Sequence, residues 1–322
     1  MNKAFESAFD RIFTCGLVPV IKLDSPDTAV PLCRALFDGG IDVAEITFRT
    51  DAAEESIKRV YAELPEVYVG AGTVSNVETA KKAIAAGAKF IISPGSNAGV
   101  IAYCVENGIP VFPGVSSATD IETCIGYGLK TVKFFPAETS GGIAAIKALS
   151  GPYPNLTFMP TGGIGEQNLL DYLNFGKIAA CGGSWMVKDD LVKAGDFAAI
   201  TELTKRAVLK MHNFRFAHMA INTDSNADAV GLAGVFDSIF ATGARETSAG
   251  AFAGDFIETI GNRNIGEHGH IAFRTTNVKR AIAYLKRIGI QIDESSIKGP
   301  ENAPTLAYLQ ESYGGFKVHI VQ

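Results

Sequence analysis

Over roughly the first two hundred residues, short apolar and β-branched runs alternate with longer segments in which apolar positions recur every three or four residues. The short runs predict eight strands: VPVIK (18–22), VAEITF (43–48), YVGAG (68–72), KFIIS (89–93), PVFPG (110–114), TVKFF (131–135), LTFMPTGG (156–163) and IAACGG (178–183). The longer segments, such as PDTAVPLCRALFDGG and NVETAKKAIAAGA, predict amphipathic helices. This alternation predicts an α/β fold, either a (β/α)8 TIM barrel or a doubly wound open sheet. The barrel is favoured because there are eight strands and most end in polar or glycine residues.

The rest of the chain has a different pattern, and that pattern is repeated. FAHMAINTDSNADAVGLAGVFDSIF and GHIAFRTTNVKRAIAYLKRIGI each predict a strand, a loop and a helix, and HMAI (218–221) aligns with HIAF (270–273). Short strand-like runs follow each unit. The sequence therefore predicts two domains: a barrel over residues 1–208 and a smaller α+β domain of two βαβββ repeats over residues 213–322.

Composition narrows the classes of function. The 322 residues are 47% hydrophobic and 20% charged, which is ordinary for a globular protein, and the net charge is −5 without a long basic run, so we expect no nucleic-acid partner. No apolar run approaches the roughly 18 residues of a membrane span. The amphipathic start MNKAFESAFDRIFTCG lacks the apolar core of a signal peptide, so we expect a cytoplasmic protein without membrane contact.

Cysteine and histidine are segregated along the chain. All five cysteines precede residue 182 and none forms a CxxC pair, which favours reduced thiols in a core. All five histidines follow residue 211. The chemistry of the two predicted domains is therefore expected to differ.

Lys133 stands out because it lies in TVKFF, a run otherwise typical of a buried strand. In barrels the chemistry lies at the carboxyl ends of the strands. Alternation along a strand puts Lys133 and Phe135 on one face, and Glu45, Thr47 and Arg49 on one face of theirs. These polar side chains are expected to point into the barrel.

Two interpretations of Lys133 remain open from the residues alone. Its ammonium can extend to the barrel mouth or pair with Glu45. Alternatively, shielding from water favours the neutral amine, which can attack a ketone and form a Schiff base. Glu45 could then move the protons that this chemistry needs, or it could simply pair with Arg49.

At these positions the chain resembles a known family. VAEITFRT, GAGTV, ISPG, TVKFFPAE, PTGGI and GGSW occur in the order and spacing found in class I pyruvate aldolases that cleave 2-keto-3-deoxy-6-phosphogluconate (KDPG) and 4-hydroxy-2-oxoglutarate (KHG). The resemblance covers about residues 1–205. It implies a (β/α)8 barrel, a homotrimer, a small 2-oxo acid substrate and no cofactor at the aldolase site.

The resemblance also implies roles for individual residues. Lys133 would form the Schiff base and Glu45 would be the general acid/base. Arg49 and Thr73 would hold the pyruvate carboxylate, and a guanidinium suits that planar group. The other implied pocket residues are Thr161 at the substrate hydroxyl region, and Pro94 and Phe135 in the wall.

Glycine pairs follow the last two predicted strands of the barrel. Gly162-Gly163 follows the seventh, and Gly182-Gly183-Ser184 follows the eighth. Barrels often bind phosphate through backbone N–H groups of these two loops, although glycines there can also serve tight turns. Such a site favours a phosphorylated substrate, but the distal carboxylate of KHG could occupy it as well.

The repeats after residue 212 resemble the vicinal oxygen chelate superfamily, which includes glyoxalase I. The resemblance implies a divalent metal bound by one residue from each of four strands: His218, Glu258, His270 and His319. His319 stands where a glutamate is more usual. Imidazole and carboxylate ligands suit Zn, Ni, Fe or Mn alike, and each histidine could instead hydrogen-bond the backbone.

These observations predict an aldolase that cleaves KDPG to pyruvate and glyceraldehyde 3-phosphate, KHG to pyruvate and glyoxylate, or both. For the C-terminal domain two alternatives stay open. It could be a metabolite- or metal-binding module for regulation or assembly, or a second metal-dependent enzyme such as an isomerase or lyase.

Overall fold

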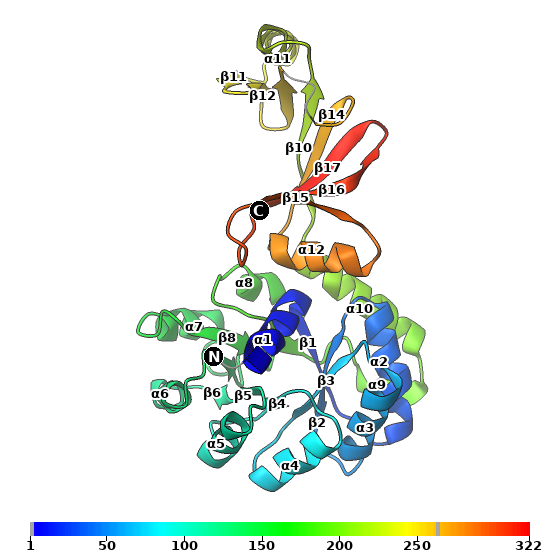
Figure 1. The fold of residues 1–322 in the computed structure, drawn as a ribbon, viewed down its shortest axis with the longest axis vertical. Coiled ribbons are helices and arrows are strands. Elements are labelled where there is room, and N and C mark those ends of the chain that lie inside the picture. Colours follow the sequence, from blue (N-terminus) through cyan, green and yellow to red (C-terminus); the bar gives the residue numbers. More distant parts are fainter. Residues whose placement is uncertain (1–2, 262–264) are drawn as a thin grey trace. The chain divides into compact units, whose positions relative to one another are not determined.

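The computed structural model describes residues 3–261 and 265–322 (Figure 1). The chain forms two compact units, one ending at Met211 and the other beginning at His212.

The first unit contains a ring of parallel strands. The strands are β1 (Leu17–Ile21), β2 (Val43–Thr47), β3 (Tyr68–Gly72), β4 (Ile91–Ile92), β5 (Val111–Phe112), β6 (Gly114–Val115), β7 (Thr131–Phe134), β8 (Thr157–Pro160) and β9 (Cys181–Gly183). They pair in the orders β5-β4-β3-β2-β1-β9 and β6-β7-β8. Two features close the ring: β5 and β6 are one run interrupted at Pro113, and bridges from Phe158 and Thr161 join β8 to the β9 segment. All eight predicted runs thus lie in a barrel, and the open sheet is excluded.

Helices surround these strands (Figure 1). They are α1 (Lys3–Cys15), α2 (Ala29–Asp38), α3 (Ala53–Glu63), α4 (Val77–Ala85), α5 (Ala98–Glu106), α6 (Ala118–Gly126), α7 (Gly142–Ser150), α8 (Leu169–Leu173), α9 (Asp189–Ala194) and α10 (Phe197–His212), with a short 3-10 turn at Pro26–Thr28. Polar side chains start several of them: Asn76 accepts a hydrogen bond from the Thr79 N–H, and Ser117 and Asp120 form a capping box. The strands bury apolar side chains on the face opposite the barrel interior, including Ile46 and Phe134.

All five cysteines are buried and reduced, as predicted. Burial raises the pKa of the Cys33, Cys104 and Cys124 thiols to about 12. These side chains therefore act as small apolar groups in the packing of the barrel.

The second unit is mostly sheet. Its elements are β10 (Arg215–Asn222), α11 (Asn226–Phe240), β11 (Ala244–Thr247), β12 (Gly250–Ala253), β13 (Ile257–Ile260), β14 (Gly269–Arg274), α12 (Val278–Arg287), β15 (Ile292–Lys298), β16 (Leu306–Tyr313) and β17 (Phe316–Val321). The strands form one eight-stranded sheet in the order β11-β12-β13-β10-β14-β17-β16-β15. In each half, the first strand pairs in parallel with the last strand of the same half, β10 with β13 and β14 with β17. The antiparallel pair β10–β14 joins the halves at the centre.

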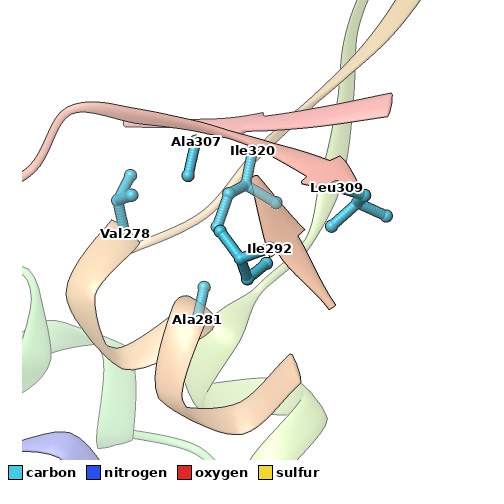
Figure 2. Close-up of a cluster of buried hydrophobic side chains, with 6 residues drawn as sticks. All are labelled: Val278, Ala281, Ile292, Ala307, Leu309 and Ile320. Atoms are coloured by element: carbon cyan, nitrogen blue, oxygen red, sulfur yellow. The ribbon is translucent and has the colours of Figure 1, made fainter. Parts of the chain in front are cut away.

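One helix packs on each half of this sheet. Under α12, Val278 and Ala281 face apolar side chains of the strands in a buried cluster (Figure 2), whose other members are Ile292, Ala307, Leu309 and Ile320. Under α11 the buried contacts are smaller, with Ala233 against Ala251 and Ala253. Within the described part of the chain, no helix is long and apolar enough to cross a membrane.

Candidate active site and candidate metal centre

The interior of the barrel holds a buried pair of opposite charges. The Nζ atom of Lys133 on β7 lies 3.3 Å from the Oε1 atom of Glu45 on β2, and the two side chains are only 4% and 1% exposed. The two strands are opposite each other in the ring, so only a closed barrel brings these side chains together. The ammonium also lies 5.1 Å from the centre of the ring of Phe135, which is two residues further along the chain.

Two buried polar atoms of the predicted site residues in the barrel lack a hydrogen-bond partner among the described residues. They are the second carboxylate oxygen of Glu45 and the hydroxyl of Thr161, and both are buried. An unpaired buried polar atom costs about 1–3 kcal/mol. The fold makes room for both: a methyl group on Gly72 would collide with the Glu45 carboxylate, and one on Gly182 with the Thr161 hydroxyl. Both atoms are therefore free to contact a bound molecule.

Arg49 and Thr73 form a second polar contact at the strand ends. The Arg49 Nε–H donates to the Thr73 hydroxyl over 3.2 Å. Thr73 has a positive φ of 59°, a left-handed conformation that costs a non-glycine residue about 1–3 kcal/mol and is concentrated at functional sites. This backbone conformation follows β3 directly and sets the direction of the Thr73 side chain.

A cavity of about 430 Å³ lies at this end of the barrel. Six residues predicted for substrate binding line it: Arg49, Phe135, Thr161, Gly162, Gly163 and Ser184. Thr73, Pro94 and Gly183 are not part of its wall, and neither are Lys133 and Glu45, which lie deeper in the barrel.

The cavity wall also contains residues that the sequence did not single out. They are Val20, Lys22, Ile164, Val187 and Asp189. Lys22 had a usable signal, because it is the last residue of the run VPVIK and therefore lies at a strand end. Asp189 begins the short helix α9 and had no comparable signal.

In the second unit, the four predicted ligands come together on adjacent strands. His218, Glu258, His270 and His319 lie on β10, β13, β14 and β17, which are consecutive in the order β13-β10-β14-β17. The Nε2 atoms of His218 and His270 are 3.1 Å apart. The Glu258 Oε2 atom is 3.5 Å from the first and 3.4 Å from the second. One ring nitrogen from each of the three histidines falls within a 4.8 Å group that could hold a metal ion.

Burial favours the neutral form of two of these imidazoles, those of His319 and His218. Burial lowers the pKa of His319 to about 3, and the neighbouring His270 and His218 act in the same direction. Burial also lowers the pKa of His218, although Glu258 opposes that shift. Both ring nitrogens of His319 and the Nδ1 atom of His270 lack partners among the described residues. Buried imidazole nitrogens without partners, grouped beside a carboxylate, suit a divalent metal.

Tyr308 on β16 is a neighbour of this cluster that the sequence did not indicate. Its ring is edge-on to His319 at 4.7 Å and to His270 at 6.1 Å. Burial raises the pKa of its hydroxyl to about 12. Tyr308 therefore stays neutral and contributes an apolar face to the cluster.

The first unit is a barrel of parallel strands with a lysine–carboxylate pair buried beneath a cavity at the strand ends, and this arrangement defines a class I, Schiff-base lyase. A family model described as "KDPG and KHG aldolase" matches residues 10–203. The chain belongs to the KDPG and KHG aldolase family.

Individual relatives agree with this assignment. The 2-dehydro-3-deoxy-phosphogluconate aldolase of Treponema pallidum is 46% identical over 200 residues, which are 62% of this chain and 95% of that protein. The KHG/KDPG aldolase of Escherichia coli K12 is 42% identical over 207 residues, 64% of this chain and 97% of that protein.

Solved structures are similar over the same part of the chain. The KDPG aldolase of Legionella pneumophila, with pyruvate captured as a covalent carbinolamine intermediate, is 38% identical with a TM-score of 0.60 and covers 62% of this chain and 97% of its own. The aldolase of Zymomonas mobilis ZM4 with 3-phosphoglycerate is 36% identical with a TM-score of 0.59 and covers 64% and 96%.

Proposed function

We propose that the barrel cleaves KDPG to pyruvate and glyceraldehyde 3-phosphate, and KHG to pyruvate and glyoxylate, with Lys133 as the nucleophile and Glu45 as the general acid/base. The observation that carries the proposal is the buried contact between these two side chains. The captured pyruvate carbinolamine in the Legionella enzyme supports the same chemistry here.

The reaction follows from the neutral amine of Lys133. The amine adds to the ketone carbon to give a carbinolamine, which loses water and becomes an iminium ion. Glu45 removes the proton of the β-hydroxyl, the carbon–carbon bond breaks, and its electrons move to the iminium nitrogen. The aldehyde leaves, and the enamine that remains on Lys133 takes a proton at carbon. Water then releases pyruvate and regenerates the amine.

The unpaired carboxylate oxygen of Glu45 is suited to accept the proton of the substrate hydroxyl. One carboxylate oxygen contacts Lys133 while the other is buried without a partner. One carboxylate oxygen can therefore contact the Lys133 nitrogen while the other accepts the proton of a substrate hydroxyl.

The remaining residues position the substrate. Arg49 and Thr73, already in contact, hold the pyruvate carboxylate. The free hydroxyl of Thr161 contacts the substrate hydroxyl region. Pro94 and Phe135 form the wall, and the distal phosphate binds backbone N–H groups of the loops that contain Gly162, Gly163, Gly183 and Ser184.

Borohydride trapping tests the proposal directly. Reducing the protein with borohydride in the presence of pyruvate should attach a three-carbon adduct to Lys133, located by peptide mass spectrometry. Lys133→Ala should form no adduct and should not cleave KDPG. An adduct on a different lysine, or full turnover by Lys133→Ala, would contradict the proposal.

For the second unit we propose a vicinal oxygen chelate-like domain of two βαβββ repeats over residues 213–322, separate from an aldolase domain over residues 1–208. In it, His218, Glu258, His270 and His319 hold a divalent metal, and the convergence of these four side chains supports this. A metal bound there would supply a Lewis acid for a pair of substrate oxygens. The domain then acts as a second enzyme, such as an isomerase or a lyase, or as a ligand-binding module. In the latter case it regulates the aldolase or assembles a cytoplasmic homotrimer.

Metal content tests the proposed metal centre. Inductively coupled plasma mass spectrometry of the full chain, loaded in turn with Zn, Ni, Mn and Fe, should give close to one metal per chain, and His218→Ala/His270→Ala should lose it. His268→Ala is the matched control, since His268 is exposed and outside the group of three histidines. If none of the four metals binds the wild-type chain, the metal centre is wrong and the assembly role remains.

A further inference from the structure

Lys22 is a cation in the wall of the barrel cavity for which the proposed chemistry has no role. Two cationic side chains line the cavity within the described part of the chain, Arg49 and Lys22. Arg49 contacts Thr73 and, in the proposed function, binds the carboxylate end of the substrate. Lys22 is therefore available for a different part of the substrate.

The position of Lys22 follows from the end of β1. Side chains alternate along a strand, so Lys22 shares a face with Val20, which also lines the cavity. On one side, β1 pairs in parallel with β9, and Pro19 lies opposite Gly183. The residue after Gly183 is Ser184, another member of the cavity wall. Lys22 thus emerges next to the loop expected to bind the distal phosphate.

The free protein holds the Lys22 ammonium in a weak, exchangeable contact. Its Nζ atom lies 3.0 Å from the Asp24 Oδ1 atom, and the two side chains are 43% and 60% exposed. The contact lowers the pKa of the Asp24 carboxyl, so Asp24 remains an anion beside Lys22. Exposed ion pairs of this kind contribute little stability because water screens them. A phosphate entering the cavity can therefore compete with Asp24 for the ammonium.

The carboxylates at this rim of the cavity disfavour the binding of an anionic substrate unless a cation offsets them. Asp189 also lines the cavity and lies beside Lys22 and Asp24 in an adjoining hollow on the same rim. The two carboxylates repel an incoming phosphate, and of the two lysines in this hollow, Lys22 and Lys193, it is Lys22 that also lines the cavity. The ammonium offsets this repulsion and offers three donors to the phosphate oxygens.

We propose that Lys22 binds the distal phosphate of the substrate and favours KDPG over KHG. This inference rests on the proposed aldolase function and adds a residue that determines substrate preference. A phosphate monoester carries about −1.5 to −2 charges near neutral pH, whereas the distal carboxylate of KHG carries one. A lysine ammonium therefore gains more from the phosphate, and removing it weakens KDPG binding more than KHG binding.

Steady-state kinetics of Lys22→Met test the inference, because methionine keeps the length of the side chain and removes the charge. The KM for KDPG should rise about tenfold, the loss of one charge-assisted contact, and the KM for KHG should rise less. The kcat for KDPG should change little, since Lys22 is remote from the bond that breaks. Lys22→Arg should restore most of the KM.

The matched control is Lys193→Met. Lys193 lines the hollow beside Asp24 but not the cavity itself. The substitution therefore removes one positive charge from the same rim without removing a substrate contact. Its KM for KDPG should stay within twofold of the wild type. A Lys22→Met enzyme with an unchanged KM for KDPG, or with equal rises for both substrates, would overturn the inference.

A separate readout distinguishes failure of this inference from failure of the proposed function. Pyruvate has no distal anion, so borohydride should trap it on Lys133 equally well in Lys22→Met and wild type. If the wild-type protein gives no adduct, the Schiff-base proposal itself fails. If both proteins give the adduct and KM does not move, only the role of Lys22 is wrong.

Discussion

The Lys133 ammonium lies 3.3 Å from the Glu45 carboxylate across the interior of the barrel, and both side chains are nearly inaccessible to water. The two residues are 88 positions apart in the sequence. A buried charge pair stabilises a fold weakly as a pair, but losing one partner leaves the other charge buried alone. The stability of the barrel and its chemistry are therefore linked through these two groups.

The first prediction concerns the stability of the pair. Lys133→Met should lower the free energy of unfolding of the barrel by about 3–5 kcal/mol, because the Glu45 carboxylate loses its counter-charge. Lys133→Met/Glu45→Gln should recover part of that loss. Denaturant unfolding followed by the fluorescence of Trp185, the single tryptophan, reports on the barrel. A double variant less stable than Lys133→Met would contradict the prediction.

The second prediction separates the nucleophile from the proton carrier. Glu45→Gln should lower kcat for KDPG cleavage by about 100-fold or more, in the range of general acid–base contributions. The same variant should still form the borohydride adduct with pyruvate, since Lys133 remains. Exchange of the pyruvate methyl protons with deuterium, followed by NMR, should slow in parallel with cleavage. Glu78→Gln, an exposed carboxylate on α4, is the control.

The third prediction compares two buried threonines. The Thr47 hydroxyl donates to the Ile21 carbonyl oxygen over 2.9 Å, whereas the Thr161 hydroxyl has no partner among the described residues. Thr47→Val should therefore cost about 1 kcal/mol of stability, and Thr161→Val should leave the stability unchanged or raise it. Activity should show the reverse order, with the larger loss in kcat/KM for Thr161→Val. Equal effects on activity would argue against a substrate contact of Thr161.

The fourth prediction is a pH dependence of the second unit. Burial lowers the pKa of His212 from 6.5 to about 3, and Arg280 and Arg287 act in the same direction. The folded unit keeps this imidazole neutral, while the unfolded chain binds a proton below its ordinary pKa. The stability contribution is therefore complete above about pH 6.5 and is lost as the pH falls toward 3, at up to about 1.4 kcal/mol per pH unit.

Scanning calorimetry of the full chain at several pH values checks this dependence. His212→Phe should flatten it, and its ring can keep the stacked contact with Phe214 and the tilted contact with Tyr284. The same substitution at the exposed His268 is the control. An unchanged slope in His212→Phe would show that other groups are responsible.

Local sequence patterns were sufficient to predict the barrel strands, because apolar runs and strand alternation depend only on near neighbours. Alternation also placed Glu45 and Arg49 on one face of their strand, and Phe135 with Lys133. The repeat of HMAI and HIAF identified His218 and His270 as equivalent positions. Resemblance then supplied Glu258 and His319, which a local pattern could not have selected.

Tertiary structure alone decided which of these side chains meet. Closure of the ring brings β2 opposite β7 and so joins Lys133 to Glu45, and the strand order β13-β10-β14-β17 gathers the histidines. The same closure puts Lys22 beside the Ser184 loop and Asp189 in the cavity wall, while Tyr308 comes against His319. These contacts depend on the register and order of strands that are far apart in the sequence. Hydrophobic periodicity reflects only near neighbours and therefore predicts neither.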